Sequence, residues 1–219
     1  MSSARCCRLN SVRARAKLFL ASSNPGKLGE YRALAATDAA GVPALDVGAE
    51  IELLPGFDAM PSFEEDAPTF AENAAGKALY YSRLGRGRVF ADDSGLVVPA
   101  LGGAPGVRSA RYVGENATDA ERIAKLLGEL RGKKSAERSA YFVCAIALAE
   151  RGRAIAIVTA RVDGEILEAA RGSGGFGYDP VFYFPALKKS FAELLPGEKN
   201  QISHRGAAFR KLLATLRAP

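Results

Sequence analysis

The chain alternates short apolar runs with segments whose apolar residues recur every three or four positions. Apolar runs bounded by turn residues or by short polar connections predict strands, and these fall at residues 17–22, 51–54, 88–91, 96–98, 139–149 and 154–162. Helical spacing predicts helices at residues 27–36, 70–84, 118–130 and 202–216. Because strands and helices alternate without a strict βαβ repeat, we expect an α/β fold with a mixed sheet.

Turn and capping residues support several of these boundaries. Asn24-Pro25-Gly26 ends the first predicted strand in a turn. Thr118 is followed three residues later by Glu121, which is the capping box that starts a helix. The polar segment 150–153 separates two β-rich runs and predicts a long hairpin. Residues 172–180 are rich in glycine and are expected to form a loop.

Composition narrows the class of protein. Hydrophobic residues make up 48% and charged residues 25% of 219 residues, which excludes wholesale disorder, a collagen-like fibre and a coiled coil. The longest uninterrupted apolar run, residues 141–149, is about half of what a membrane-spanning helix needs. The three cysteines include the adjacent Cys6 and Cys7 and cannot form a disulfide framework. We therefore expect a cytoplasmic protein without a membrane partner.

The net charge of +6 is unevenly distributed. Residues 1–16 hold four arginines and no acidic residue, so the remaining chain carries only +2. A nearly neutral body does not bind phosphate backbones by bulk electrostatics, so we expect no nucleic-acid partner. Residues 1–16 are expected to be a disordered basic extension before a single domain at 17–219, with a transit peptide as the alternative. Its removal should leave activity and melting temperature unchanged, because it has no apolar periodicity.

A hydroxyl-rich loop lies between the first predicted strand and the first predicted helix. Its residues are Ser22, Ser23, Asn24, Pro25, Gly26 and Lys27. Backbone N–H groups and the positive end of a helix can bind a phosphate there, and Lys27 adds a charge. The spacing is not the Walker pattern, and an ordinary turn with a surface lysine has the same appearance.

Two carboxylates, Asp92 and Asp93, follow the apolar run at 88–91. Carboxylates resist burial beside a strand unless they are paired or bound to a cation. Hard oxygen ligands close to a phosphate loop favour Mg²⁺, although an Asp-Asp pair can also cap its own turn. Glu64-Glu65-Asp66 offers further carboxylates, or is simply a solvated acidic loop.

Two clusters near the carboxyl end complete the candidates. Phe176 and Tyr178 stand between glycines in the segment 174–180, where an aromatic ring can stack on a base or fold back onto the core. Lys199 and the segment 203–206 follow, and His204 is the only histidine. With no second histidine and an isolated Cys144, neither a Ser-His-Asp or Cys-His catalytic site nor a zinc site is supported.

These clusters together resemble one known family. The motifs stand in the family's order at residues 23–27, 64–65 with 69–74, 91–96, 103–107, 109–112, 174–180 and 202–206. They are similar to those of the inosine triphosphate pyrophosphatase family, also called XTP/dITP diphosphatases. The resemblance covers nearly all of residues 17–217. Residues 1–16 lie outside the family's pattern, which leaves the site assignments intact.

The resemblance implies a fold and an activity. The fold would be a long mixed sheet flanked by helices, with a substrate cleft between two lobes. The family hydrolyses non-standard purine nucleoside triphosphates (ITP, dITP and XTP) to monophosphate and pyrophosphate with Mg²⁺, usually as a homodimer. The residue chemistry agrees, because cleaving a phosphoanhydride needs charge neutralisation and an activated water rather than a covalent nucleophile.

The resemblance also implies roles for individual residues. Asp93 would be metal ligand and general base, and Glu64 the second metal carboxylate, although the motif does not distinguish it from Glu65. Ser22 to Lys27 would hold the triphosphate. Substrate contacts would also come from Ser94, Phe176, Gly177, Tyr178, Asp179, Lys199, His204 and Arg205, the last two at the base. Ser22 is threonine in many relatives, a change that keeps the hydroxyl.

Two other functions are compatible with the same residues. A nucleotide- or RNA-binding module could use the lysines and aromatics without chemistry, but a pure phosphate binder has no use for Asp92 and Asp93 without a metal. A phosphatase that releases inorganic phosphate is not distinguished from a pyrophosphohydrolase by the sequence. The identity of the product separates the two enzymes.

Overall fold

The structure is a computed structural model that describes residues 17–36 and 49–217. The expected extension at residues 1–16 lies outside the described residues. No helix within the described ranges is long and apolar enough to cross a membrane.

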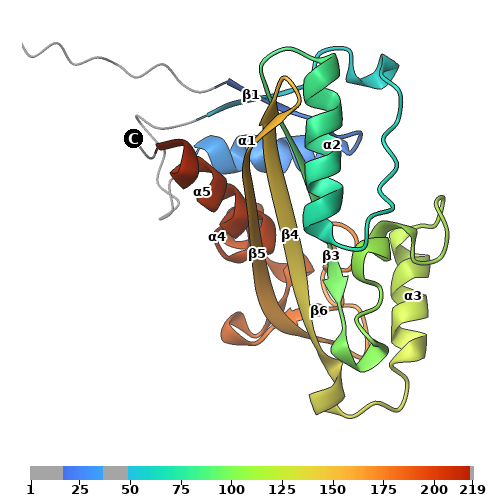
Figure 1. Ribbon diagram of the computed structural model, residues 1–219. Helices are drawn as coiled ribbons and strands as arrows, with labels where there is room; N and C mark the ends of the chain where they lie inside the picture. Colours follow the sequence, from blue (N-terminus) through green and yellow to red (C-terminus); the bar gives the residue numbers. More distant parts are fainter. Residues whose placement is uncertain (1–16, 37–48, 218–219) are drawn as a thin grey trace, which may run out of the picture.

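A mixed sheet forms the centre of the molecule (Figure 1). Its strands are β1 (Lys17–Leu20), β2 (Glu50–Leu53), β3 (Arg88–Val97), β4 (Ser139–Glu150), β5 (Arg153–Ile166), β6 (Phe182–Phe184) and β7 (Lys189–Ser190). Their order across the sheet is β2-β1-β3-β4-β5-β6-β7. β1 pairs in parallel with β2 and β3, whereas the other pairs are antiparallel. The predicted α/β fold with a mixed sheet and the long β4–β5 hairpin are confirmed.

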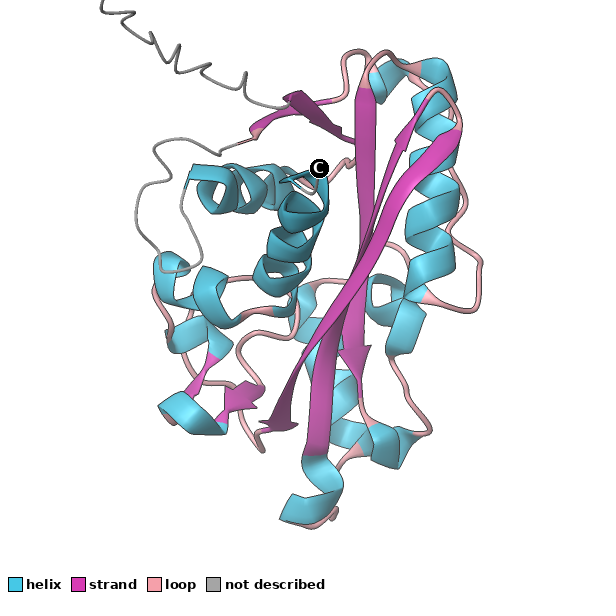
Figure 2. Ribbon diagram, turned by 60° about the vertical axis from the view of Figure 1, so that its left-hand side comes forward, coloured by secondary structure: helices cyan, strands magenta, loops and turns pink. Residues whose placement is uncertain are grey.

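Helices cover both faces of this sheet (Figure 2). They are α1 (Pro25–Ala36), α2 (Phe70–Leu84), α3 (Asp119–Glu129), α4 (Pro196–Ile202) and α5 (His204–Arg217). The short 3₁₀ helices are η1 (Phe57–Ala59), η2 (Pro99–Leu101), η3 (Gly106–Arg111), η4 (Ser135–Arg138), η5 (Pro185–Leu187) and η6 (Phe191–Glu193). α2 packs on one face, and α1 and α5 pack on the other.

The acidic pair lies inside a strand, which corrects the prediction of a strand end. β3 continues through Asp92 and Asp93 to Val97 because β4 pairs with it along its whole length. On its other side, β1 pairs only with residues 88–90 of β3. No strand of the described structure therefore pairs with this edge of β3 at the acidic pair, at the place where the loop after β1 begins.

The last predicted helix, residues 202–216, corresponds to α5, which begins two residues later than predicted, because Ile202 is the last residue of the shorter helix α4. Ser203 has an extended conformation (φ −69°, ψ 154°) and separates α4 from α5. Its Oγ accepts a hydrogen bond of 3.1 Å from the backbone N–H of Gly206, which caps the start of α5. The break places His204 and Arg205 in the first turn of a new helix.

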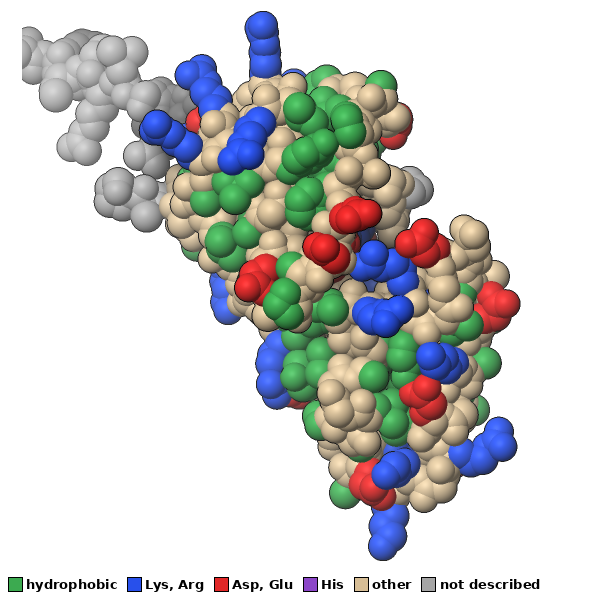
Figure 3. Space-filling model, turned by 45° about the vertical axis from the view of Figure 1, so that its right-hand side comes forward, with side chains coloured by type: hydrophobic (Ala, Val, Ile, Leu, Met, Phe, Trp, Pro, Cys, Tyr) green, Lys and Arg blue, Asp and Glu red, His purple; other side chains and the backbone are tan. Residues whose placement is uncertain are grey.

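Apolar side chains form separate clusters at the two ends of the long strands. One cluster packs α1 and α5 against the sheet, and a second packs α2 on the opposite face. A third joins α3, β6 and the far end of β4. The first two belong to an upper lobe and the third to a lower lobe in Figure 1. Acidic and basic side chains gather between them on the face shown in Figure 3.

Candidate active site

The loop between β1 and α1 is held in shape by its own side chains. Oδ1 of Asn24 accepts a hydrogen bond of 2.9 Å from the backbone N–H of Gly26, and Oγ of Ser22 accepts one of 3.2 Å from Asn24. This arrangement presents the amino end of α1, whose partial positive charge favours an anion. The predicted phosphate loop therefore has suitable local geometry.

Strand alternation sends Asp92 and Asp93 to opposite faces of the sheet. Asp92 lies with Phe90 on the face covered by α1 and α5, whereas Asp93 lies with Ala91 on the face covered by α2. The two carboxylates therefore have different partners and different chemistry.

Asp92 is fully enclosed between two cations. Oδ1 lies 3.0 Å from Nζ of Lys27, and Oδ2 lies 3.5 Å from Nε of Arg205. Burial alone would raise the pKa of Asp92, but the charges of Lys27 and Arg205 lower it to about 2. Asp92 is thus a permanent carboxylate with no contact to the cavity described below.

Asp93 is only 8% exposed, and within the described structure it forms no ion pair of the kind that Asp92 makes. Nδ2 of Asn73 donates a hydrogen bond of 3.0 Å to its Oδ2. Burial, together with the nearby charge of Glu65, raises the pKa of Asp93 to about 6, although the Asn73 hydrogen bond and the charge of Lys27 oppose this shift. A carboxylate in this state can exchange a proton near neutral pH or accept a cation.

The acidic loop before α2 contributes Glu65 to the site. Glu65 lines the same cavity as Asp93 and forms an ion pair with Nζ of Lys77. Glu64 is exposed and lies outside the lining residues. Glu65 is therefore the better placed of the two glutamates, and Lys77, one helical turn after Asn73 on α2, is a cavity cation that sequence reasoning missed.

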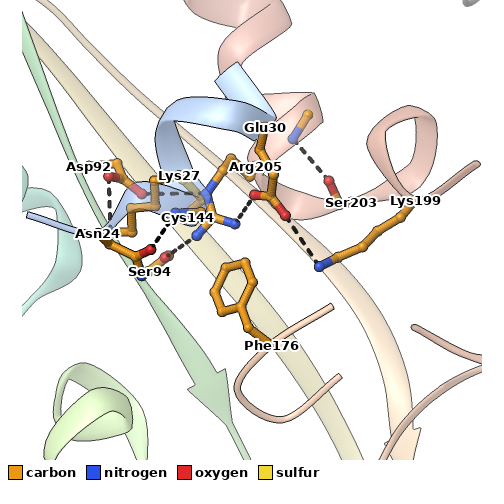
Figure 4. A network of polar contacts seen from close by, with 12 residues as sticks. Asn24, Lys27, Glu30, Asp92, Ser94, Cys144, Phe176, Lys199, Ser203 and Arg205 are labelled. Carbon is orange, nitrogen blue, oxygen red and sulfur yellow. Dashed lines mark hydrogen bonds and ion pairs between the residues drawn. The ribbon is translucent and has the colours of Figure 1, made fainter. Parts of the chain in front are cut away.

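At the opposite end of the site, a carboxylate on α1 joins two cations from the last two helices (Figure 4). Oε2 of Glu30 lies 2.5 Å from Nη1 of Arg205, and Oε1 lies 3.4 Å from Nζ of Lys199. Lys199 also contacts Oδ2 of Asp179 at 2.5 Å, and Arg205 donates a 2.9 Å hydrogen bond to Oγ of Ser94. Both cations thus have fixed positions before any ligand arrives.

His204 is buried beside these cations. Its ring stacks on Phe142 with the centroids 4.7 Å apart, and Nδ1 has no hydrogen-bond partner within the described structure. Burial and the charges of Arg205 and Lys199 hold the pKa of His204 well below its usual value. The neutral imidazole can therefore donate or accept a hydrogen bond at a ligand.

The glycine-rich loop is tied to its surroundings at consecutive residues. Oδ2 of Asp179 accepts a 2.9 Å hydrogen bond from the backbone N–H of Phe176, and Asp119 accepts one of 2.7 Å from Gly177. Tyr178 is buried and its hydroxyl donates to the carbonyl of Ser109 at 2.9 Å. These contacts leave Phe176 as the more exposed ring of the loop.

Phe176 stands next to the two cations that Glu30 joins, Lys199 and Arg205. Its ring centroid lies 4.9 Å from Nζ of Lys199 and 5.4 Å from the guanidinium carbon of Arg205. The sequence left open whether an aromatic of this loop faces a ligand or the core. The exposed Phe176 is placed to stack on a flat ring, whereas Tyr178 packs in the core and reaches the cavity wall.

A cavity of about 710 Å³ connects the two ends of the site. This volume is typical of small-molecule sites. The residues singled out from the sequence that line it are Ser22, Ser23, Asn24, Gly26, Lys27, Asp93, Ser94, Phe176, Gly177, Tyr178, Asp179, Lys199, His204 and Arg205. Pro25 is the first residue of α1, and the exposed Glu64 is not among the lining residues.

The charges of the cavity are balanced except at one residue. Its cations, each with a carboxylate partner, are Lys27, Lys77, Arg122, Lys199 and Arg205. Among the described residues, Asp93 is the lining carboxylate that has no ion-pair partner. No cluster of three or more metal-ligating side chains occurs in the described ranges, so a cation here would share Asp93 with few other protein ligands.

Known proteins are similar to this chain in both sequence and fold. The profile of the Ham1 family matches residues 18–215. A dITP/XTP pyrophosphatase of Geobacillus kaustophilus is 52% identical over 196 residues, which cover 90% of this chain and 92% of that protein. A dITP/XTP pyrophosphatase of Gloeobacter violaceus is 52% identical over 200 residues, with the same coverage of 90% and 92%. The solved structure of a HAM1 protein from Coxiella burnetii has a TM-score of 0.78 at 44% identity, covering 92% of this chain and 98% of that one.

Proposed function

The chain belongs to the Ham1 family, and on that premise we propose that it hydrolyses the non-standard purine nucleoside triphosphates ITP, dITP and XTP to the monophosphate and pyrophosphate. Relatives named dITP/XTP pyrophosphatases support this activity. The observation that carries it is the cavity with two different ends. Lys27 and Asp93 stand at an end suited to a polyphosphate, and Lys199 and Arg205 at an end suited to a base.

We propose that the reaction uses Mg²⁺, held by Asp93 and Glu65. Asp93 fits this role because it is the lining carboxylate without a cation partner in the described part of the chain. Mg²⁺ commonly binds through one or two carboxylates together with substrate phosphates and water, so a pair of protein ligands is sufficient. When bound, Mg²⁺ would neutralise triphosphate charge and polarise a phosphoryl oxygen. The exposed Glu64 is less suited than Glu65 to this role.

The side chains around Asp93 supply the remaining chemistry. Asp93 would accept a proton from the attacking water, and its pKa of about 6 places much of it in the basic form at neutral pH. Lys27, Lys77 and the amino end of α1 would bind the triphosphate oxygens. Cys144 is no candidate for a covalent nucleophile, because burial raises the pKa of its thiol to about 12.

The base end supports a preference for a 6-oxo purine. Arg205 carries a guanidinium, which only donates hydrogen bonds, and a 6-oxo group accepts them. Adenine presents an amino donor at that position, and a donor facing a donor costs about 1–3 kcal/mol, or roughly 5–150-fold. Phe176 would stack on the purine ring. Guanine shares the 6-oxo group, so its exclusion rests on the names of the relatives.

We also propose that the enzyme is a cytoplasmic homodimer. The lack of a disulfide framework agrees with a reducing compartment, since the described structure holds Cys144 as a buried free thiol. Size-exclusion chromatography with light scattering tests the oligomeric state.

The function is tested by comparing four triphosphates. We expect kcat/KM for ITP and XTP to exceed that for ATP by roughly 5–150-fold, and to exceed that for GTP as well. EDTA should abolish turnover and excess Mg²⁺ should restore it. Equal kcat/KM for ITP and ATP would contradict the base-site roles of Arg205 and His204. Full activity in EDTA would contradict the proposed requirement for Mg²⁺.

A further inference from the structure

Asp92 touches the two ends of the site at once. One of its oxygens pairs with Lys27 of the phosphate loop at 3.0 Å, and the other faces Nε of Arg205, at the base end, at 3.5 Å. The two cations lie on α1 and α5, which are far apart in sequence. Figure 4 shows both of them converging on this carboxylate.

The described structure indicates no other role for the side chain of Asp92. It is fully enclosed, and it is not among the residues that line the cavity, whereas Lys27 and Arg205 are. It therefore cannot contact a substrate or bind a metal in the cavity. Its side chain also lies on the opposite face of the sheet from that of Asp93.

Electrostatics makes the two contacts interdependent. A buried carboxylate without a partner is strongly unfavourable, so both cations are drawn toward Asp92. Nε of Arg205 and Oδ2 of Asp92 have no hydrogen-bond partner in the described structure. Their contact at 3.5 Å is an ion pair only. Glu30 and Ser94 also hold Arg205. The charge of Asp92 adds an attraction that relates the position of Arg205 to that of Lys27.

We propose that Asp92 is a positioning residue that holds Lys27 and Arg205 in a fixed relation and thereby couples recognition of the triphosphate to recognition of the base. This inference rests on the proposed function. Its consequence is that loss of the Asp92 charge weakens binding at both ends, although Asp92 touches neither end of the substrate.

Glu30 provides the matched comparison. It contacts Arg205 at 2.5 Å and Lys199 at 3.4 Å, but its ion pairs do not include Lys27. A Glu30→Gln variant should therefore disturb the base end alone. Asp163→Asn, at an exposed carboxylate on β5 that is not among the residues lining the cavity, controls for the chemical change itself.

The test uses the full-length chain and separate probes of the two ends. Inorganic tripolyphosphate, as a competitive inhibitor, reports on the phosphate end, and the ratio of kcat/KM for ITP to that for ATP reports on the base end. Asp92→Asn should raise the inhibition constant and lower the ratio, each by about 5-fold or more. Glu30→Gln should lower the ratio only, and Asp163→Asn should change neither.

A merely structural role predicts a different result. Asp92→Asn would then lower the melting temperature but leave both the inhibition constant and the ratio unchanged, which would overturn the proposal. If this variant does not fold, the cycle of Lys27→Met, Arg205→Lys and the double variant replaces it. Losses in kcat/KM that deviate from multiplicativity by about 5-fold support the coupling, and multiplicative losses contradict it. A wild-type chain that hydrolyses no nucleotide would instead refute the proposed function, whatever the variants do.

Discussion

Nδ2 of Asn73 on α2 donates a hydrogen bond of 3.0 Å to Oδ2 of Asp93 on β3. The same amide accepts a hydrogen bond of 2.9 Å from the backbone N–H of Ala67. One buried side chain thus connects the candidate general base to the loop that carries Glu65. The relative position of the two proposed Mg²⁺ ligands therefore depends on Asn73.

We predict that Asp93→Asn lowers kcat for ITP by about 10²-fold or more. The amide keeps the shape of the side chain but loses the charge that binds a cation and the basicity that accepts a proton. Steady-state kinetics at saturating Mg²⁺ measures the effect, with Asp163→Asn as the control at an exposed carboxylate. Near-native turnover of the Asp93 variant would show that Asp93 is not a catalytic residue.

Replacement of Asn73 by leucine should affect both stability and turnover. The variant leaves the buried groups at Asp93 and Ala67 without their partner, so the free energy of unfolding should fall by about 1–3 kcal/mol. Urea denaturation measures this loss, and Asn116→Leu at an exposed loop residue is the control. Turnover should fall less than in Asp93→Asn, because the carboxylate remains. An unchanged kcat would show that Asn73 does not orient Asp93.

The fold was largely predictable because it depends on local patterns. The predicted helix at 70–84 coincides with α2, and the capping box at Thr118 begins α3 as expected. The errors arose where neighbours decide the outcome. The continuation of β3 through Asp92 depends on pairing with β4 over ten residues, and the start of α5 depends on the cap that Ser203 provides.

The site was predictable residue by residue but not as a network. Side chains with distinctive chemistry, such as Lys27 and Asp93, were found from motifs, and both line the cavity. Glu30 was missed because its partner Arg205 is 175 residues away in sequence, and Lys77 was missed because a lysine on a helix is normally solvated. Periodicity carries no information about such long-range ion pairs.

Gly175 should be less replaceable than Gly177, although both have positive φ values of 72° and 63°. A Cβ at Gly175 would overlap Oδ2 of Asp179, which holds the loop, whereas one at Gly177 meets open space. Each alanine variant carries a backbone cost of about 1–2 kcal/mol. We expect Gly175→Ala to raise KM for ITP several-fold more than Gly177→Ala, and equal KM values would exclude a role for the Asp179 contact in substrate binding.

His204 should make the protein less stable in acid. Its pKa is held well below the usual value in the folded state by burial, Arg205 and Lys199. The unfolded chain takes up a proton near pH 6.5, so it binds more protons than the folded chain below that pH. Stability from this residue is thus complete at pH 7.5 and declines as pH falls.

Urea unfolding at pH 7.5 and pH 5.5 measures the effect. Between these values, wild type should lose about 1 kcal/mol more than His204→Gln, which cannot take up the proton. Asp93 and the other carboxylates titrate in both proteins, so their contributions to the loss of stability cancel when the two losses are compared. An equal loss in both would mean that His204 is protonated in the folded protein.

The identity of the products tests the proposed reaction most directly. Wild type and Asp93→Asn, purified in parallel, are incubated with ITP and Mg²⁺, and the products are resolved by anion-exchange chromatography and ³¹P NMR. We predict equal amounts of IMP and pyrophosphate from wild type and almost none from the variant. IDP with inorganic phosphate would show a phosphatase instead, and unchanged ITP bound to the wild-type protein would show a binding module without chemistry.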